Sequence, residues 1–400
     1  MKEVALLYDA DYFLGRSQNL YNYLTSIYRD LHQFPELSFQ EKRTSSKVAE
    51  ELKKMGIEVK EKIGGYGVIG NLKGAKEKPL IALRADMDAL PIHEETNLPF
   101  SSQHRGIMHA CGHDAHTAIL LGTAQILSEI KDQLSSSVRF IFQPAEEVNE
   151  GAKAMISEGV VDEVDEIYGL HNLPILETGK VAVKSGAMMG SVDKIEISVI
   201  GNGGHGAIPD MSIDPIVASS AIIQGIQSIV SREISPFEPV VITIGSIHGG
   251  SSYNVIPNEV KIEGTVRTLN LQTQRKIEGR LRELIENVAK SYRCSVKIKH
   301  INMVPPLVNW EDNVDCVKKA ASQIVGENNC MEAQPVLAGE DFSLYLQRKP
   351  GAFFWLGCKP KKEEEVFGLH HPKYRIDESC IPLGSAILAM LVYMRISEIL

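Results

Sequence analysis

The stretch PLIALRAD, residues 79–86, decides the fold, because it is a nearly continuous apolar run that ends in polar residues. Such a run is expected of a β-strand that is covered on both faces. Periodicity predicts a helix, a strand, a helix and a further strand after it, at residues 114–130, 137–143, 151–159 and 165–171. Strands that alternate with helices in this way predict a mainly parallel α/β sheet.

Polar residues stand at the carboxyl ends of these strands, in RAD (84–86), QPAEE (143–147) and GLH (169–171). In open α/β sheets, ligands bind in the crevice beyond the carboxyl ends of the strands. We therefore expect the three segments to deliver their polar side chains to one edge of the sheet.

A second pattern interrupts the first one. Its segments are predicted as strand, helix, strand, strand, helix and strand, at residues 194–201, 214–233, 239–249, 259–268, 272–292 and 294–302. This order is the split-βαβ pattern of a ferredoxin-like sandwich. The sequence thus predicts an α/β domain formed by residues 1–186 and 304–400, with a ferredoxin-like domain inserted at residues 187–303.

The composition excludes several function classes. The 400 residues are 44% hydrophobic and carry a net charge of −9, which argues against nucleic acid as a partner. No secretory signal is recognised at the N-terminus, and the most apolar later segment, residues 381–394, is too short to span a bilayer, so no membrane partner is expected. Six scattered cysteines indicate reduced thiols and a cytoplasmic location.

The segment GIMHACGHDAHTAILLG, residues 106–122, places Cys111 and three histidines directly before an apolar run. It is open to three interpretations: a metal site, a thiol catalytic centre, or a helix that begins with histidines. The spacing of Cys111 and His113 is weakly specific by itself. Asp114 suits the N-cap of a helix, and His116 could simply face the solvent.

Glu146 and Glu147 are adjacent carboxylates that follow a predicted strand. One can bind a metal while its neighbour accepts a proton from water, although acids are also common at the N-terminus of a helix such as the one that follows. His171 and the His370–His371 pair add imidazoles at a strand end and in a loop. This inventory suits two divalent ions with a bridging anionic ligand, and water between two such ions becomes a nucleophile near neutral pH.

Taken together, the motifs resemble the M20 metallopeptidases, and within them the amidohydrolase branch that includes hippurate hydrolases, N-acyl-amino-acid deacylases and the plant auxin-conjugate hydrolases. The resemblance covers nearly the whole chain, and its motifs follow the family's order. They are RDLHQFPELSFQE, LRADMDALPI, MHACGHDAHTAILLG, FQPAEE, GLHNLP, GNGGHGAIPD, YNVIPNEVKIEGTVRT, AGEDFSLYL and LHHPKY.

The resemblance implies a dinuclear metal site. In it Cys111 bridges the two ions, His113 and His171 complete one shell, and Glu147 and His370 complete the other. Glu146 resembles the general base that takes a proton from water and passes it to the leaving amine. His370 is preferred to His371, because the family's ligand stands two residues before the proline.

One family position differs. The peptidase branches have a metal-binding His where this chain has Arg84, and His113 resembles the substitute found in the amidohydrolase branch. Arg84 cannot bind a metal because it stays protonated. The resemblance implies that Asp86 or Asp88 supports a ligand His by a hydrogen bond, although a helix cap or ion pair is an equal alternative.

The inserted domain resembles the family's lid. His205 is expected to stabilise the oxyanion of the tetrahedral intermediate, often from the partner subunit of a dimer. Asn254 and Arg267 are expected to hold the free carboxylate of the substrate. Without the resemblance, these two would be interpreted as a turn asparagine and a strand-surface arginine.

These expectations define a cytoplasmic amidohydrolase that cleaves the amide bond of N-acyl amino acids, such as hippurate or N-acetyl amino acids, with two divalent ions. It is expected to form a homodimer or a higher homo-oligomer through the inserted domain. Mn, Zn, Co and Ni are all compatible with the ligand types. Three alternatives stay open: a metal-dependent carboxypeptidase or dipeptidase, a thiol hydrolase that uses Cys111, and a non-catalytic binding protein.

Overall fold

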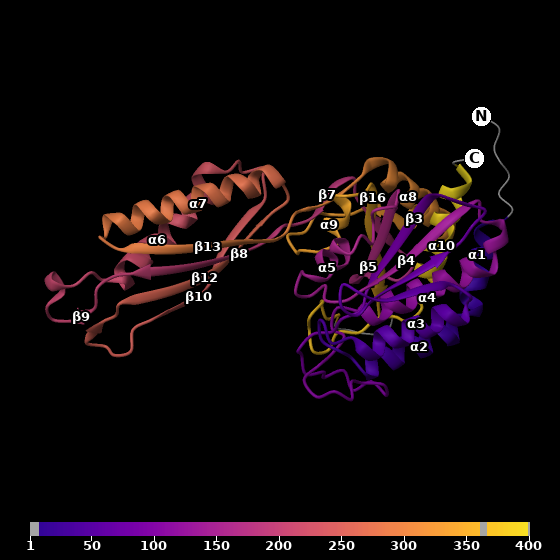
Figure 1. Ribbon diagram of the computed structural model, residues 1–400, viewed down its shortest axis with the longest axis horizontal. Helices are drawn as coiled ribbons and strands as arrows, with labels where there is room; N and C mark the ends of the chain where they lie inside the picture. The colour runs from indigo at the N-terminus through magenta and orange to yellow at the C-terminus, as the bar shows by residue number, and fades with distance from the viewer. Residues whose placement is uncertain (1–7, 361–365, 399–400) are drawn as a thin grey trace. The chain divides into compact units, whose positions relative to one another are not determined.

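The computed structural model describes residues 8–360 and 366–398 and divides into two compact units (Figure 1). Unit 1 consists of Met1–Gly186, Val308–Gln334 and Asp341–Leu400, and unit 2 consists of Ala187–Leu307 and Pro335–Glu340. Residues 304–307 and 335–340 therefore group with the inserted unit, whereas the sequence pattern assigned them to the α/β domain.

Backbone pairing explains this difference. Strand β13 (Ser295–Val304) stays paired with β8 (Val192–Ile200) as far as Val304. Val336 donates its backbone N–H to the carbonyl oxygen of Met188 at 3.0 Å, which ties the second segment to the start of unit 2. Contacts between segments so far apart in the chain leave no local periodicity in the sequence.

Unit 1 contains an eight-stranded sheet of order β1-β2-β4-β3-β5-β16-β6-β15. The strands are β1 (Glu58–Ile63), β2 (Gly67–Leu72), β3 (Lys76–Asp86), β4 (Ser136–Gln143), β5 (Glu166–Glu177), β6 (Val181–Val183), β15 (Cys330–Glu332) and β16 (Gly351–Lys359). The central strands β4, β3, β5 and β16 are mutually parallel, which confirms the predicted mainly parallel sheet. The charged strand β1 was not predicted, because an exposed edge strand carries no apolar run.

Three parallel strands bring the predicted polar residues to one edge of this sheet. Asp86 at the end of β3 lies opposite Gln143 at the end of β4. Arg84 of β3 lies opposite Gly169 of β5, so His171, two residues further along, is level with Asp86. The three polar segments therefore meet, as their positions in the sequence predicted, but β5 continues to Glu177, so the prediction that His171 stands at the end of its strand was wrong.

Helices pack against the sheet of unit 1. They are α1 (Ala10–Asn19), α2 (Tyr21–Gln33), α3 (Lys42–Lys54), α4 (His113–Glu129), α5 (Gly151–Ser157), α8 (Glu311–Val325), α9 (Ser343–Leu346) and α10 (Cys380–Glu398), with 3-10 turns at Lys131–Gln133 and Glu327–Asn329. Their apolar faces share one core with the sheet; Leu24 of α2, Leu120 of α4 and Phe354 of β16 are all fully or almost fully buried in it.

Helix α10 is longer than its apolar stretch indicated. It begins at Cys380 and has 19 residues, so by length and composition it could cross a membrane, and the prediction that it is too short was wrong. The apolar window Cys380–Ser397 is 78% buried inside the fold. The helix therefore has the burial of a core helix.

Unit 2 is an antiparallel sheet of order β10-β12-β8-β13 with two helices, and Figure 1 shows α7 running along the sheet. Besides β8 and β13, it contains α6 (Pro215–Ser228), β10 (Val240–Gly249), β12 (Glu259–Thr268) and α7 (Leu271–Ser291), with short pieces β9 (Gly204–His205), β11 (Val255–Ile256), Pro209–Met211 and a π turn at Ile229–Glu233. Strands β7 (Gly186–Met189) and β14 (Leu307–Asn309) lie where the chain passes between the units. The order β8-α6-β10-β12-α7-β13 confirms the ferredoxin-like insertion.

Alternating residues explain the layers of unit 2. Ile195, Ile197 and Val199 of β8 are buried under the helices, while the residues between them point the other way. Asp214 caps α6 by accepting the backbone N–H of Ile216, which fixes where the helix begins.

Candidate metal centre

The turn that carries Cys111 ends at helix α4. Gly112 has a φ of 85° and precedes the first helical residue, His113, so the predicted N-cap at Asp114 was wrong. Asp114 lies in the first turn instead, where its Oδ2 accepts from Nδ1 of His32 at 2.7 Å. Gly112 thus separates Cys111, which precedes the helix, from His113, its first residue.

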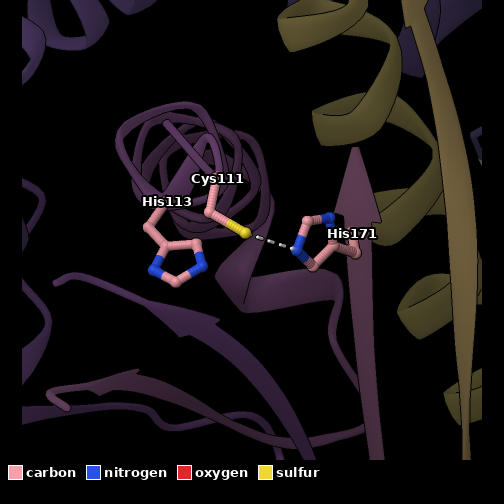
Figure 2. A group of neighbouring side chains, drawn as sticks. All are labelled: Cys111, His113 and His171. Atoms are coloured by element: carbon pink, nitrogen blue, oxygen red, sulfur yellow. Dashed lines mark hydrogen bonds between the residues drawn. The ribbon is translucent and has the colours of Figure 1, made fainter. Parts of the chain in front are cut away.

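A first group of possible metal ligands consists of Cys111, His113 and His171. Their ligand atoms all lie within 4.8 Å of one another. Cys111 Sγ is 3.3 Å from Nε2 of His171, and Figure 2 shows the cysteine between the two imidazole rings. His171 donates its Nδ1–H to the carbonyl oxygen of Asn172 at 2.8 Å, which turns Nε2 toward the sulfur.

A second group consists of Cys111, Glu147 and His370, again within 4.8 Å of one another. Nε2 of His370 lies 3.4 Å from Oε1 of Glu147. His370 has a φ of 64°, and its backbone N–H donates to the carbonyl oxygen of Ala110 at 2.8 Å. His371 instead stacks on the Phe367 ring at 4.4 Å, so the two histidines of LHHP point to different surroundings.

Cys111 is common to both groups, which is the arrangement that a bridging ligand requires. Two buried atoms around it, Nε2 of His113 and Oε1 of Glu147, have no hydrogen-bond partner among the described residues. They lie 3.9 Å apart. Buried lone pairs without a partner are costly, and a shared cation between thiol, imidazole and carboxylate would satisfy them. The residues present therefore fit a divalent metal centre.

Asp88 links the start of helix α4 to the segment that carries Glu146 and Glu147. Its Oδ1 lies 3.2 Å from Nδ1 of His113, which leaves Nε2 as the ring nitrogen that can face a metal. Its two carboxylate oxygens also accept the backbone N–H groups of Glu146 and Glu147, each at 3.1 Å. Ala145 before them has a φ of 55°. One buried carboxylate thus sets the positions of both glutamates relative to His113.

Asp86 supports the neighbouring histidine. Its Oδ1 accepts from Nδ1 of His116 at 2.6 Å, and Nε2 of His116 accepts the backbone N–H of Asn172 at 3.0 Å. His116 is 1% exposed, which excludes the alternative that it faces the solvent. Arg84 donates to Asp86 and to Asp341, both at 2.7 Å, in place of the histidine of the H-x-D motif.

Asp86, His113 and His116 also have ligand atoms within 4.8 Å of one another. Both nitrogens of His116 already have hydrogen-bond partners, whereas Nε2 of His113 has none among the described residues. The geometry therefore favours His113 over His116 as the ligand.

The electrostatics of Cys111 differ from those of a catalytic thiol. Burial, together with Glu147 and Glu146, raises the pKa of Cys111 well above its usual value. Burial and the nearby His116 lower the pKa of His171, which therefore stays neutral. An activated nucleophilic cysteine needs a lowered pKa and a positive neighbour, so a thiol mechanism finds no support in these residues.

Sequence reasoning missed a buried histidine behind the site. His32 bonds to Asp114 and, through Nε2, to Oε1 of Glu94 at 3.1 Å. The motif HQFPELSFQE was a usable signal, because Ser38 of the same motif donates to Asp88 at 2.6 Å. His109 is also buried, and neither of its ring nitrogens has a hydrogen-bond partner in the part of the chain that the structure describes.

The expected oxyanion-stabilising residue and the two expected carboxylate-binding residues lie in unit 2, where two of the three are neighbours. His205 of β9 pairs with Val255 of β11, and Asn254 accepts the backbone N–H of Gly206 at 2.8 Å. Figure 1 shows β9 beyond the end of the four-stranded sheet at which β12 begins. His205 and Asn254 are both exposed.

Arg267 lies near the other end of β12. It is eight residues from Glu259, the first residue of that strand, which is roughly 26 Å at the rise of a β-strand. Burial lowers the pKa of Arg267, and its Nη1 has no hydrogen-bond partner among the described residues. One copy of unit 2 therefore does not bring Arg267 together with His205 and Asn254.

Three characterised relatives are similar over almost their whole length. N-acetylcysteine deacetylase of Bacillus subtilis (strain 168) is 41% identical over 377 residues, covering 94% of this chain and 97% of the relative. Thermostable carboxypeptidase 1 of Saccharolobus solfataricus is 40% identical over 374 residues, covering 92% and 94%. IAA-amino acid hydrolase ILR1-like 2 of Arabidopsis thaliana is 38% identical over 388 residues, covering 96% and 88%.

A solved structure is also similar to this chain over almost its whole length. The Bacillus subtilis YXEP protein, described as a dinuclear metal binding peptidase from the M20 family, superposes with a TM-score of 0.83 at 37% identity, covering 95% of this chain and 99% of that one. The sequence model of peptidase family M20/M25/M40 matches residues 82–394. The chain therefore belongs to peptidase family M20/M25/M40, within its amidohydrolase branch, and is a metal-dependent amide hydrolase.

Proposed function

We propose that this protein hydrolyses the amide bond of N-acyl amino acids and releases a carboxylic acid and a free amino acid. The observation that carries the proposal is that Cys111 belongs to both possible ligand groups, with Glu146 directly beside Glu147. Relatives named as N-acetylcysteine deacetylase and IAA-amino acid hydrolase support the substrate class.

We assign the metal ligands from the two groups of residues that share Cys111. Cys111, His113 and His171 would hold one ion, and Cys111, Glu147 and His370 would hold the other. The unpartnered buried atoms Nε2 of His113 and Oε1 of Glu147 support this assignment. Thiolate, imidazole and carboxylate together accept Zn, Mn, Co or Ni, so the ligand types leave the metal open.

When bound, two divalent cations supply Lewis acidity, which polarises an amide carbonyl and lowers the pKa of water. Glu146 accepts the proton of the attacking water and returns it to the leaving amine. Glu146 is 8% exposed, and its backbone N–H donates to Asp88 at 3.1 Å, which fixes the backbone from which the carboxylate extends. His205 donates a hydrogen bond to the carbonyl oxygen as negative charge develops on it.

Recognition of the substrate carboxylate falls to Asn254 and Arg267. A guanidinium with an unpartnered nitrogen suits a carboxylate, and Nη1 of Arg267 has no hydrogen-bond partner among the described residues. Because Asn254 and His205 stand at the opposite end of the sheet from Arg267, a single unit 2 does not place all three around one substrate. We therefore propose a homodimer in which the partner subunit supplies His205 and Asn254.

The dimer can be tested by mixing two inactive variants. In a mixture of Glu146→Gln and His205→Ala chains, each mixed dimer contains one site with both residues intact. Co-refolding equal amounts should restore about a quarter of the wild-type activity, because half of the dimers are mixed and half of their sites are complete. Zero recovery with proven mixed dimers would show that His205 acts within its own chain.

The substrate class is tested by a hydrolysis screen. N-acetyl, N-benzoyl and N-indoleacetyl amino acids would be assayed with Mn²⁺ or Zn²⁺, alongside dipeptides with a free amino group. We expect cleavage of at least one N-acyl series. If none is cleaved while the metal is bound, the proposed substrate class is wrong. A preference for dipeptides would favour the second candidate, a carboxypeptidase or dipeptidase, which the similarity to thermostable carboxypeptidase 1 supports.

The general base has its own test with a matched control. Glu146→Gln should lower kcat by roughly 10²- to 10⁴-fold while the metal content stays unchanged. Glu150→Gln is the control, because Glu150 is on the same acidic segment but pairs with Lys153 at 2.9 Å. Equal activity of the two variants would remove Glu146 from the mechanism.

The cellular location remains a prediction. All six cysteines are free in the structure, which supports the expected reducing compartment. Fractionation of the host cell with an antibody against this chain would test it, and recovery outside the cytoplasmic fraction would contradict it.

A further inference from the structure

Asn172 follows His171 on β5 and is fully buried. Its side-chain Nδ2 donates to the carbonyl oxygens of Cys111 at 3.3 Å and Gly112 at 3.2 Å. Both partners can only accept, so the NH₂ group must face them and the amide orientation is determined. The amide thus holds the backbone of the turn that presents the cysteine.

The remaining polar groups of Asn172 contact the other parts of the site. Oδ1 accepts from the hydroxyl of Tyr374, four residues after His370. The backbone N–H donates to Nε2 of His116 at 3.0 Å, and the backbone carbonyl accepts from Nδ1 of His171 at 2.8 Å. A single residue therefore connects the cysteine turn, the middle of β5 and the segment that follows His370.

Gly112 provides an independent observation of how closely this contact is packed. A Cβ at Gly112 would lie 2.2 Å from Nδ2 of Asn172 and 2.5 Å from the Tyr374 hydroxyl oxygen. Both distances are shorter than real Cβ contacts allow. The turn is therefore pressed against Asn172 with no space for a side chain between them.

We propose that Asn172 is a positioning residue that holds the Cys111–Gly112 turn against β5, so that Cys111 Sγ stays within reach of both ligand groups. The proposal rests on the proposed function in one respect, the assignment of Cys111 and His171 as ligands. It goes beyond that function by naming the residue that aligns those ligands before any metal binds.

The substitution Asn172→Asp tests it with almost no change in shape. A carboxylate oxygen in place of Nδ2 cannot donate to the two carbonyl oxygens and repels them, so the turn should move away from β5. The matched control is Asn309→Asp. Asn309 is also buried, and its Nδ2 donates to the carbonyl oxygens of Lys184 and Phe353, away from the ligand groups.

The first measurement uses metal-free protein. Alkylation of Cys111 would be followed by peptide mass spectrometry, with Cys294 of unit 2 as an internal reference, since both thiols are buried. We expect Asn172→Asp to raise the rate at Cys111 about tenfold or more relative to Cys294, and Asn309→Asp to leave that ratio unchanged. This comparison needs neither metal nor activity.

The second measurement uses Co²⁺ as the probe metal. Asn172→Asp should weaken Co²⁺ binding by about tenfold or more and reduce the sulfur-to-cobalt charge-transfer band, as loss of an outer-shell contact does. Wild-type alkylation and Co²⁺ titration curves in this variant would overturn the proposal. If Asn172→Asp does not fold, Tyr374→Phe replaces it, with a smaller change in the same direction expected and an unchanged Cys111 rate decisive against it.

Different results would contradict the proposed function and the positioning role of Asn172. Absence of N-acyl amino acid hydrolysis by the wild-type protein would contradict the proposed function only. An unchanged Cys111 alkylation rate in Asn172→Asp would contradict the positioning role even in a fully active enzyme.

Discussion

Sγ of Cys111 lies 3.3 Å from Nε2 of His171, although the two residues are 60 positions apart in the chain. Burial raises the pKa of the thiol and lowers that of the imidazole, so neither group is charged near neutral pH without a further partner. A neutral thiol is a poor nucleophile, whereas a cation placed beside it would stabilise the thiolate and use the imidazole as a second ligand.

Metal removal should therefore abolish hydrolysis. Prolonged dialysis against a chelator is expected to give an inactive protein whose activity returns with Mn²⁺ or Zn²⁺, and Cys111→Ala should bind fewer metal equivalents by elemental analysis. Activity that survives complete metal removal would instead indicate a thiol hydrolase.

The two histidines of LHHP should respond differently to substitution. His370→Ala is expected to lower metal content and activity, because Nε2 of His370 lies 3.4 Å from Oε1 of Glu147. His371→Ala should affect metal content little, since His371 stacks on Phe367. The reverse ranking in a metal titration would overturn the assignment of His370.

A methyl group at Gly112 should disrupt the site. Gly112→Ala meets both a φ of 85° and a clash with Asn172, whereas Gly106→Ala meets a φ of 81° with nothing within 4 Å of the added carbon. The control should therefore show only the backbone cost of about 1–2 kcal/mol. We expect Gly112→Ala to lower the thermal midpoint further and to lose metal; equal effects of the two variants would show that the close approach is unimportant.

The interactions of His32 with Asp114 and Glu94 should make the free energy of unfolding depend on pH. Burial alone would lower the pKa of His32, but its bonds to Asp114 and Glu94 outweigh burial and raise the pKa to about 9. A raised folded pKa contributes stability that is fully present below the unfolded pKa of about 6.5 and is lost as pH rises through about 9.

His32→Gln should accordingly lower the thermal midpoint of metal-free protein more at pH 6 than at pH 10. The contribution is expected to be on the order of 1–3 kcal/mol. A difference between wild type and variant that is the same at both pH values would show that His32 is not charged in the folded protein.

Local patterns predicted the elements that hold the site, because each is long and periodic. The apolar run of β3 and the helix after Gly112 need no distant partner to be recognised. Other features lacked such a signal. The charged edge strand β1 resembles a loop in composition, and the start of α10 at Cys380 depends on packing rather than on its apolar stretch.

The sequence by itself determined which polar segments gather at the carboxyl edge of the sheet, since the parallel strands all run toward that edge. Only the tertiary structure decided what each histidine does. His113 and His116 lie one turn apart on α4, yet Asp86 and Asn172 occupy both nitrogens of His116, while Asp88 leaves Nε2 of His113 open. The reason is physical: hydrogen-bond partners on distant strands, which no local pattern records, determine which imidazole lone pair remains available for a metal.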